Sequence, residues 1–290
     1  KKVAIFVIFT VLAALLLSTT VVAQDTIVRG GTFLVSEGQQ APFVRNFNPY
    51  APDPTRWARS AVYEPLVIFN PVDAVEPTPW LADSYEYSDD LMSLTYYLHE
   101  GIRWSDGEDF NADDVVFTIQ MMIDFPAMDR LGILAFVDSV EKVDDFTVKV
   151  NLKEVYTQAD TVLGQLWPVP EHIWSSIEDP VNFTNPEPVG TGPLTEVVAV
   201  NEQVLELCRN DDYWQMGADG QPLPYIDCMR MPVYPGNDPA NLAAVNGELD
   251  WIGNFIADID STFVAADPEN HHYYFWPGGA TVQLYVNTTK

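Results

Sequence analysis

Basic residues are scarce in this chain of 290 residues. Lysine and arginine together number 14, against 42 aspartates and glutamates, so the formal net charge is −28. A surface of this sign repels phosphate backbones and anionic lipid headgroups, which argues against a nucleic-acid partner and against adhesion to a membrane surface. We attribute the acidity to solubility or to adaptation to salt, because the acidic residues are spread along the whole chain.

Long apolar runs are missing after the N-terminal segment. Residues 1–23 are the exception, because Lys1 and Lys2 precede an apolar run from Val3 to Leu17, and Val21 to Ala23 offers a cleavage tripeptide. This pattern predicts a secretory signal peptide over 1–23. A signal anchor is the alternative, but the run is shorter than the ~20 residues that a membrane-spanning helix needs. We therefore expect an exported protein, periplasmic or extracellular and associated with the cell envelope.

Cysteine is nearly absent, with Cys208 and Cys228 as the two examples. Both lie on predicted strands that could be neighbours, and export permits a disulfide between them. The alternative is a pair of free buried thiols, and we expect the disulfide. Two cysteines do not form a metal site, and the His271-His272 pair has no cysteine nearby, so we expect no bound metal.

Motifs for catalysis and cofactor binding are also lacking. The chain has no G-x-S-x-G sequence, and Gly190-Thr191-Gly192 is followed by Pro193, which removes an N–H that a phosphate-binding loop would use. His172 could be a general base, but it follows Pro170-Glu171 at a predicted helix start, where packing is the better interpretation. The sequence therefore assigns no catalytic residue and no cofactor.

The segment from Thr95 to Met122 carries the clearest pattern that is present. Its start is rich in β-branched and aromatic residues and predicts a strand, and Asp106-Gly107 predicts a tight turn. Asn111 can cap a helix, which Pro126 ends. Local patterns predict further elements: strands at 30–35, 197–200, 203–209, 225–233 and 282–290, a hairpin within 135–152, and a helix at 239–246.

Several motifs resemble the dipeptide/oligopeptide/nickel family of extracellular solute-binding proteins, the receptors that feed ABC importers. The most specific is Trp104-Ser105-Asp106-Gly107 followed by Ala112 to Thr118, which is similar to the family's W/H-x-D-G turn and A-x-D-V-x-F-T/S helix start. The other matching segments are Tyr63 to Leu66, Trp80 to Tyr85, Gly190 to Leu194 (where Leu194 replaces the family's usual aromatic residue), Arg209 to Trp214 and Gly247 to Trp251.

The resemblance implies a mixed α/β, two-lobed fold of the periplasmic-binding-protein type (type II, the cluster with an extra domain). It assigns residues 24–60 and 186–287 to lobe I, 61–185 to an inserted subdomain, and 288–290 to the start of a crossover into a second lobe. Family members are considerably longer. We therefore expect the second lobe, with the ligand residues that it supplies, to be largely absent from this chain.

The resemblance also implies a non-enzymatic, monomeric receptor. Such a receptor closes two lobes around a small-molecule solute and delivers it to the permease subunits of an ABC transporter. The expected solute is an oligosaccharide or an oligopeptide, and the chain looks most like the members that bind β-linked sugars such as cellobiose. A secreted glycoside hydrolase and a periplasmic chaperone-like protein are the alternatives. A hydrolase needs two carboxylates at a fixed separation, and no motif singles out such a pair here.

Aromatic and amide side chains near the C-terminal end are the predicted ligand contacts. Trp251, Phe255 and Tyr285 offer flat faces for the C–H surfaces of sugars, and Asn254 offers an amide for their hydroxyls. Core packing is an equally good interpretation of Trp251.

A second set of predicted contacts follows the first strand. Asn48 and Tyr50 belong to an Asn-Pro segment that runs near the ligand cleft in the family that the chain resembles. An ordinary Asx turn is the alternative interpretation.

Overall fold

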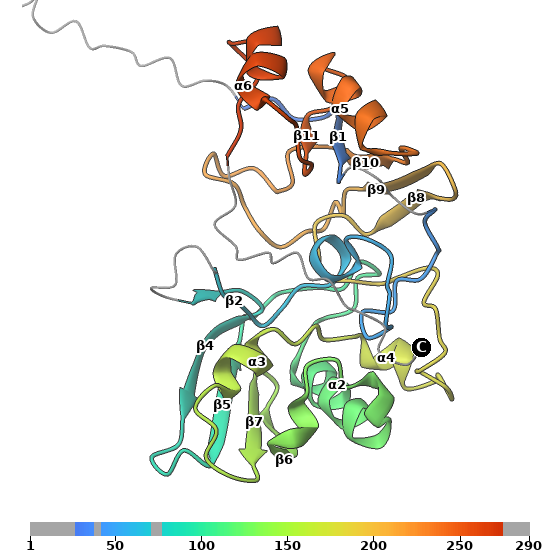
Figure 1. Cartoon of the computed structure of the whole chain (residues 1–290). Coiled ribbons are helices and arrows are strands. Elements are labelled where there is room, and N and C mark those ends of the chain that lie inside the picture. The colour runs from blue at the N-terminus through green and yellow to red at the C-terminus, as the bar shows by residue number, and fades with distance from the viewer. Residues whose placement is uncertain (1–26, 38–41, 71–76, 275–290) are drawn as a thin grey trace, which may run out of the picture.

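The computed structural model of the chain describes residues 27–37, 42–70 and 77–274, and two separate sheets organise it (Figure 1). A five-stranded sheet has the order β11-β1-β10-β9-β8, and a four-stranded sheet has the order β4-β5-β7-β6. A two-stranded ladder joins β2 (Val67–Ile68) to β3 (Thr78–Pro79). The predicted signal peptide lies outside the described residues.

The five-stranded sheet combines the first strand of the described chain with strands near its other end. Its members are β1 (Thr32–Ser36), β8 (Glu196–Val200), β9 (Val204–Cys208), β10 (Cys228–Pro232) and β11 (Trp251–Ile252). Strand β1 lies between β10 and β11 and is parallel to both, with Thr32 opposite Cys228 and Val35 opposite Trp251. The remaining pairs are antiparallel. The predicted strands in these regions are confirmed.

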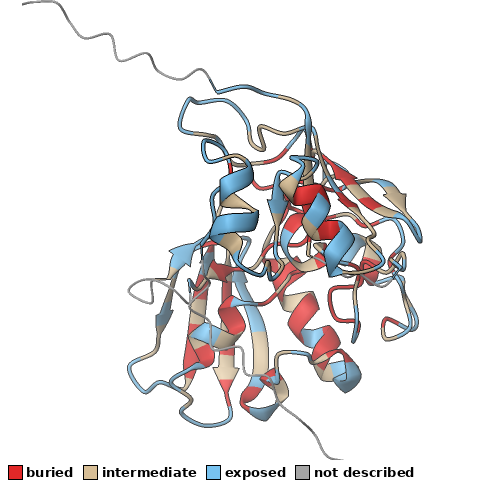
Figure 2. Ribbon diagram, turned by 45° about the horizontal axis from the view of Figure 1, so that its top comes forward, coloured by how far each residue is buried: buried red, intermediate tan, exposed pale blue. Residues whose placement is uncertain are grey.

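The four-stranded sheet is local in sequence and antiparallel throughout. Its strands are β4 (Ala82–Tyr87), β5 (Ser93–Leu98), β6 (Val137–Asp144) and β7 (Thr147–Leu152). Alternate residues of β7 are buried, and α2 (Ala112–Asp124) packs its buried face on β6 and β7 (Figure 2). The sheet falls within the predicted inserted subdomain 61–185, and the segments assigned to lobe I supply the other sheet. The domain boundaries themselves stay a prediction.

The N-terminus of α2 has the predicted cap. The Asn111 side chain accepts a hydrogen bond from the Asp113 N–H (2.7 Å), and the Asp114 carboxylate accepts one from the Asn111 N–H (3.0 Å). Asp114 also accepts from Trp104 Nε1 (3.1 Å) and from the Glu171 N–H (2.9 Å). This buried carboxylate therefore joins the turn before α2 to the start of α4 (Glu171–Trp174).

The other helices are short. They are α3 (Ala159–Gly164), α5 (Asn237–Val245), α6 (Ile259–Thr262), a π-helical turn η1 (Ala58–Val62), and 3₁₀ turns η2 (Pro126–Met128), η3 (Ile133–Ala135) and η4 (Val264–Ala266). None of the helices in the described part of the chain combines the length and the apolar character that crossing a membrane would require.

The Gly190 to Pro193 segment packs directly against the backbone of η1. The Gly192 N–H donates to the Val62 carbonyl (3.0 Å), and a Cβ atom added at Gly190 would lie 2.0 Å from that same oxygen. Such a separation is far below van der Waals contact, so a side chain cannot be accommodated there without moving the backbone. Gly190 therefore allows the backbones of this segment and η1 to lie in contact. This structural role agrees with the absence of phosphate-loop features in the sequence.

Glu64 is a buried carboxylate that links its own segment to two others, one at Trp80 and one at Tyr213 and Trp214. One oxygen accepts hydrogen bonds from Trp80 Nε1 (2.8 Å) and from the Tyr213 hydroxyl (2.7 Å), and the other accepts from Trp214 Nε1 (3.1 Å). The residue is 2% exposed. Burial raises the pKa of Glu64, and the three donors oppose that rise. We call Glu64 with these three partners the Glu64 cluster.

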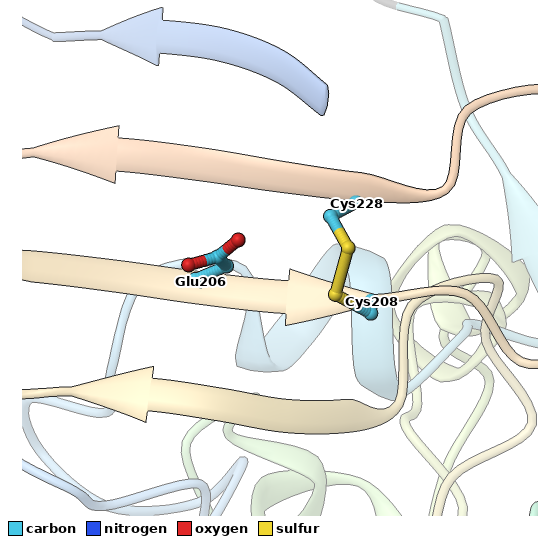
Figure 3. A group of neighbouring side chains, drawn as sticks. All are labelled: Glu206, Cys208 and Cys228. Carbon is cyan, nitrogen blue, oxygen red and sulfur yellow. A yellow bond between two sulfur atoms is a disulfide. The ribbon is translucent and has the colours of Figure 1, made fainter. Parts of the chain in front are cut away.

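The predicted disulfide between Cys208 and Cys228 is confirmed (Figure 3). The two residues lie directly opposite each other on β9 and β10, with S–S 2.00 Å. Glu206 lies close to the sulfurs, and the three residues form the one grouping of possible metal-ligand atoms found in the described part of the chain. Because each sulfur is bonded to the other, neither is available as the thiolate that a metal would need.

Candidate functional site

A cleft of about 1220 Å³ lies beside β11, at the edge of the five-stranded sheet. We call it the aromatic cleft. One continuous part of the chain lines it, from α5 through α6 to the last described residues. The lining residues are Ala244, Leu249, Asp250, Trp251, Ile252, Gly253, Asn254, Phe255, Ile256, Asp258, Ile259, Asp260, Ser261, Phe263, His272, Tyr273 and Tyr274.

Strand β1 anchors the Asp250 to Gly253 segment that lines this cleft. The Asp250 carboxylate accepts from the Leu34 N–H (2.7 Å), and the Asp250 N–H donates to the Leu34 carbonyl (2.8 Å). Two residues beyond Trp251, the Gly253 N–H donates to the Ser36 carbonyl (2.8 Å). These bonds hold Trp251 between two anchored positions. The ring of Trp251 also lies over Gly253, where an added Cβ would be 2.5 Å from a ring carbon.

Four aromatic side chains of the cleft remain open to solvent. Trp251 and Tyr273 are each 39% exposed, Tyr274 is 68% exposed, and Phe255 is 79% exposed. A protein core normally buries such side chains, so their gathering at one cleft indicates a surface for an apolar or amphipathic partner. The structure therefore disagrees with the core-packing interpretation of Trp251.

The polar groups of the cleft are amides and carboxylates. Asn254 donates through Nδ2 to Asn241 Oδ1 (2.7 Å), and Asn241 donates to the Phe255 carbonyl (3.1 Å), so the two amides fix the segment after β11. The Tyr273 hydroxyl donates to Asp260 Oδ1 (3.1 Å), and this bond raises the pKa of Tyr273. Flat rings beside hydrogen-bond acceptors can hold a polyhydroxylated solute.

The wall opposite β11 is built by α6 and the turn before it. Asp258 adopts the left-handed conformation (φ 48°), and its carbonyl accepts from the Ser261 and Thr262 N–H groups. Farther along, His271 Nδ1 bonds to the Phe263 carbonyl (2.7 Å), and the two rings stack with centroids 4.2 Å apart. These contacts fix the chain just before Tyr273 and Tyr274, which line the cleft.

The model of the bacterial extracellular solute-binding proteins, family 5 (middle part), matches residues 76–290. The chain belongs to this family. Family 5 proteins are binding proteins and not enzymes, which agrees with the lack of catalytic motifs. The match includes both the four-stranded sheet and the aromatic cleft.

Relatives in family 5 differ in what they bind. Heme-binding protein A of Haemophilus influenzae is 32% identical over 53% of this chain and 32% of its own length. Di/tripeptide-binding protein 1 of Pseudomonas aeruginosa is 29% identical over 47% of this chain and 30% of its own length. The chain thus spans about a third of the length of these curated relatives.

A solved relative shares the fold of the described chain. It is the mannohexaose-bound periplasmic oligopeptide-binding protein of an oligopeptide ABC transporter from Thermotoga maritima. The two chains superpose with a TM-score of 0.70 and are 26% identical, over 80% of this chain and 43% of the other. The two-lobed, mixed α/β fold class expected for this family 5 member is therefore confirmed, with part of that fold present here.

The structure brings together Trp251, Asn254 and Phe255, three of the predicted contact residues, in the aromatic cleft. Tyr285 lies outside the described residues. Tyr273 and Tyr274 line the cleft but were not among the predicted contacts. The aromatic sequence His271 to Phe275 was the signal that could have indicated them.

Asn48 and Tyr50 are placed away from this cleft, in the core. Both are fully buried. Asn48 donates to the Pro180 carbonyl (3.0 Å) and the Phe183 carbonyl (2.8 Å), and its Oδ1 accepts from the Tyr50 N–H (2.9 Å). The Tyr50 hydroxyl donates to the Trp167 carbonyl (2.5 Å). The structure thus shows the Asx turn that was the alternative, and we do not propose either residue as a ligand contact.

His172, considered as a general base and assigned to packing, lies on the surface of α4. Its Nε2 is 2.8 Å from Asp106 Oδ2. This contact ties α4 to the turn before α2, and His172 does not line the aromatic cleft.

Proposed function

We propose that the full-length protein is an exported substrate-binding protein of an ABC importer, and that the aromatic cleft captures an oligosaccharide for the permease subunits. Four exposed aromatic rings beside carboxylate and amide groups support this proposal. Sugars present apolar C–H faces and hydroxyl edges, and the cleft offers a matching surface for each. The Thermotoga maritima relative, which shares the fold of this chain and has mannohexaose bound, supports the proposal.

An oligopeptide is the second candidate, and the position of β11 favours it. This strand lies at the edge of the five-stranded sheet. An extended peptide can add a strand to such an edge through main-chain hydrogen bonds. The exposed rings would then form pockets for its side chains.

The first test is titration calorimetry of the full-length protein with cello- and manno-oligosaccharides and with a pool of di- to pentapeptides. We expect stoichiometric binding of a sugar, with no product formed, and about 10- to 100-fold weaker binding by a Trp251→Ala variant, as for a central aromatic contact. A matched control is Trp80→Phe, which lies in the Glu64 cluster and not in the cleft. Binding of peptides alone would favour the second candidate, and hydrolysis of the sugar would contradict both.

A further inference from the structure

A second pocket, of about 600 Å³, is lined by residues between Pro42 and Ser60, two of which are arginines. Arg56 and Arg59 line it, together with the carboxylate of Asp53. By contrast, the described residues that line the aromatic cleft include no lysine or arginine. With 14 basic residues against 42 acidic ones in the chain, two arginines at one pocket call for an explanation.

Arg59 of this pocket and the neighbouring Arg130 have backbone carbonyls as their hydrogen-bond partners. Arg59 donates to the Pro49 carbonyl (2.5 Å) and the Ala51 carbonyl (3.0 Å), and Arg130 donates to the Tyr50 carbonyl between them (2.8 Å). Among the described residues, no carboxylate lies within 4.0 Å of either guanidinium group. Carbonyl dipoles compensate only part of a full charge, so Arg59 contributes positive potential to the pocket.

Arg56 is the arginine that a ligand can reach. Its side chain is 55% exposed, and its Nη2 is 3.1 Å from Glu37 Oε2. Glu37 directly follows β1, whose last residue, Ser36, accepts the hydrogen bond from Gly253 in the aromatic cleft. The ion pair therefore lies one residue beyond the strand that holds Gly253 of the aromatic cleft. A planar guanidinium can exchange one carboxylate for another, because each accepts the same charge-assisted hydrogen bond.

The backbone next to Arg56 is strained. Trp57, which also lines the pocket, has φ 65° and ψ 0°, a conformation that non-glycine residues seldom adopt. Its carbonyl accepts from the Ala61 N–H (2.8 Å) and starts the π-helical turn η1. Strain of this kind persists where surrounding structure holds it, and it gathers at ligand-binding segments.

We propose that this arginine pocket is a subsite for a carboxylate group on the solute held by the aromatic cleft. Arg56 binds the carboxylate, and Glu37 occupies Arg56 until the solute displaces it. The subsite rests on the proposed function, because it extends the same binding surface past the end of β1. The carboxylate belongs either to an acidic oligosaccharide or to the C-terminus of a peptide.

The test compares Arg56→Gln and Glu37→Gln variants of the full-length protein with an Arg103→Gln control. Arg103 is also exposed and also paired with one carboxylate, that of Asp109, and it does not line the pocket. Calorimetry measures the affinity for cellotetraose against its aldonic acid, and for a tetrapeptide against its C-terminal amide. The two pairs distinguish the two sources of the carboxylate.

The expected result is a pair of opposite effects on one charged ligand. Arg56→Gln should weaken binding of the carboxylate-bearing ligand about 10- to 100-fold, the usual range for a lost charge-assisted hydrogen bond. The affinity for the neutral ligand of the same pair should change by no more than about twofold. Glu37→Gln should strengthen binding of the carboxylate-bearing ligand several-fold, because it removes the competing carboxylate. A merely structural ion pair would make both variants weaken binding or leave it unchanged.

Two other outcomes separate the subsite from the proposed function. If the wild type binds a neutral solute but prefers no carboxylate, or if Arg56→Gln affects charged and neutral ligands equally, the subsite is wrong and the receptor function stands. If the wild type binds no sugar and no peptide, the proposed function fails and the subsite fails with it.

Discussion

Replacing Glu64 with alanine should lower the free energy of unfolding by about 3 kcal/mol. The change removes the acceptor of three hydrogen bonds and leaves the N–H groups of Trp80 and Trp214 and the hydroxyl of Tyr213 without it. An unsatisfied buried donor costs about 1–3 kcal/mol. We take the lower end for each of the three, because Trp80 and Trp214 are half-buried and water can reach them.

The pH dependence of a Glu64→Gln variant tests the same cluster more finely. Burial raises the pKa of Glu64 in the folded protein above its value in the unfolded chain. Folding therefore favours the protonated form of Glu64. Its contribution to the free energy of unfolding is complete at a pH below the pKa in the unfolded chain, and it is lost as the pH rises through the pKa in the folded protein. Glutamine does not titrate. The stability difference between wild type and Glu64→Gln should therefore shrink as the pH rises from 4 to 7.

Urea unfolding of the full-length protein, followed by tryptophan fluorescence, measures both effects, because two of the three partners are tryptophans. Glu202→Ala, an exposed residue in the turn between β8 and β9, is the control and should change little. A stability difference that grows with pH would refute the reasoning. It would mean that the three donors outweigh burial and hold Glu64 as an anion.

Three further changes test other parts of the structure. Replacing Cys208 and Cys228 together with serine opens a loop with a sequence separation of 20 and should cost about 3 kcal/mol in urea unfolding; equal stability of the double variant would contradict this. Gly190→Ala places a Cβ 2.0 Å from the Val62 carbonyl and should cost about 3 kcal/mol or abolish soluble expression, whereas Gly220→Ala, with open space around it, should cost less despite its positive φ. Asn111→Ala removes the cap of α2 and should cost about 1 kcal/mol, detectable as faster amide exchange in the first turn of the helix.

Local patterns were enough to predict most of the elements. Asn111 and the turn at Gly107 determine where α2 begins, and both signals lie within a few residues of it. The β6–β7 hairpin is likewise defined by alternation around its own turn. The disulfide could be predicted because each cysteine lies on a strand with a clear pattern, and export permits the bond.

Features that depend on distant segments could not be derived in this way. Trp80, Tyr213 and Trp214 each belong to a segment that resembles the family, but no spacing in the sequence shows that they meet at Glu64. The burial of Asn48 could not be derived for the same reason, because the carbonyls of Pro180 and Phe183 that accept its hydrogen bonds lie far along the chain. Trp251 was placed at the site by resemblance, whereas its exposure follows from its edge position in the sheet.

The position of β1 between β10 and β11 has a consequence for the order of folding. The four-stranded sheet can close from contacts within residues 82–152, whereas β1 has both of its neighbours at residues 228–252. Closing so long a loop is slow compared with forming local hairpins. We therefore expect the first strand to remain without partners through most of the folding reaction. The Asp250 to Gly253 segment of the aromatic cleft is held by β1, so the proposed capture of solute should be among the last properties that the folding chain acquires.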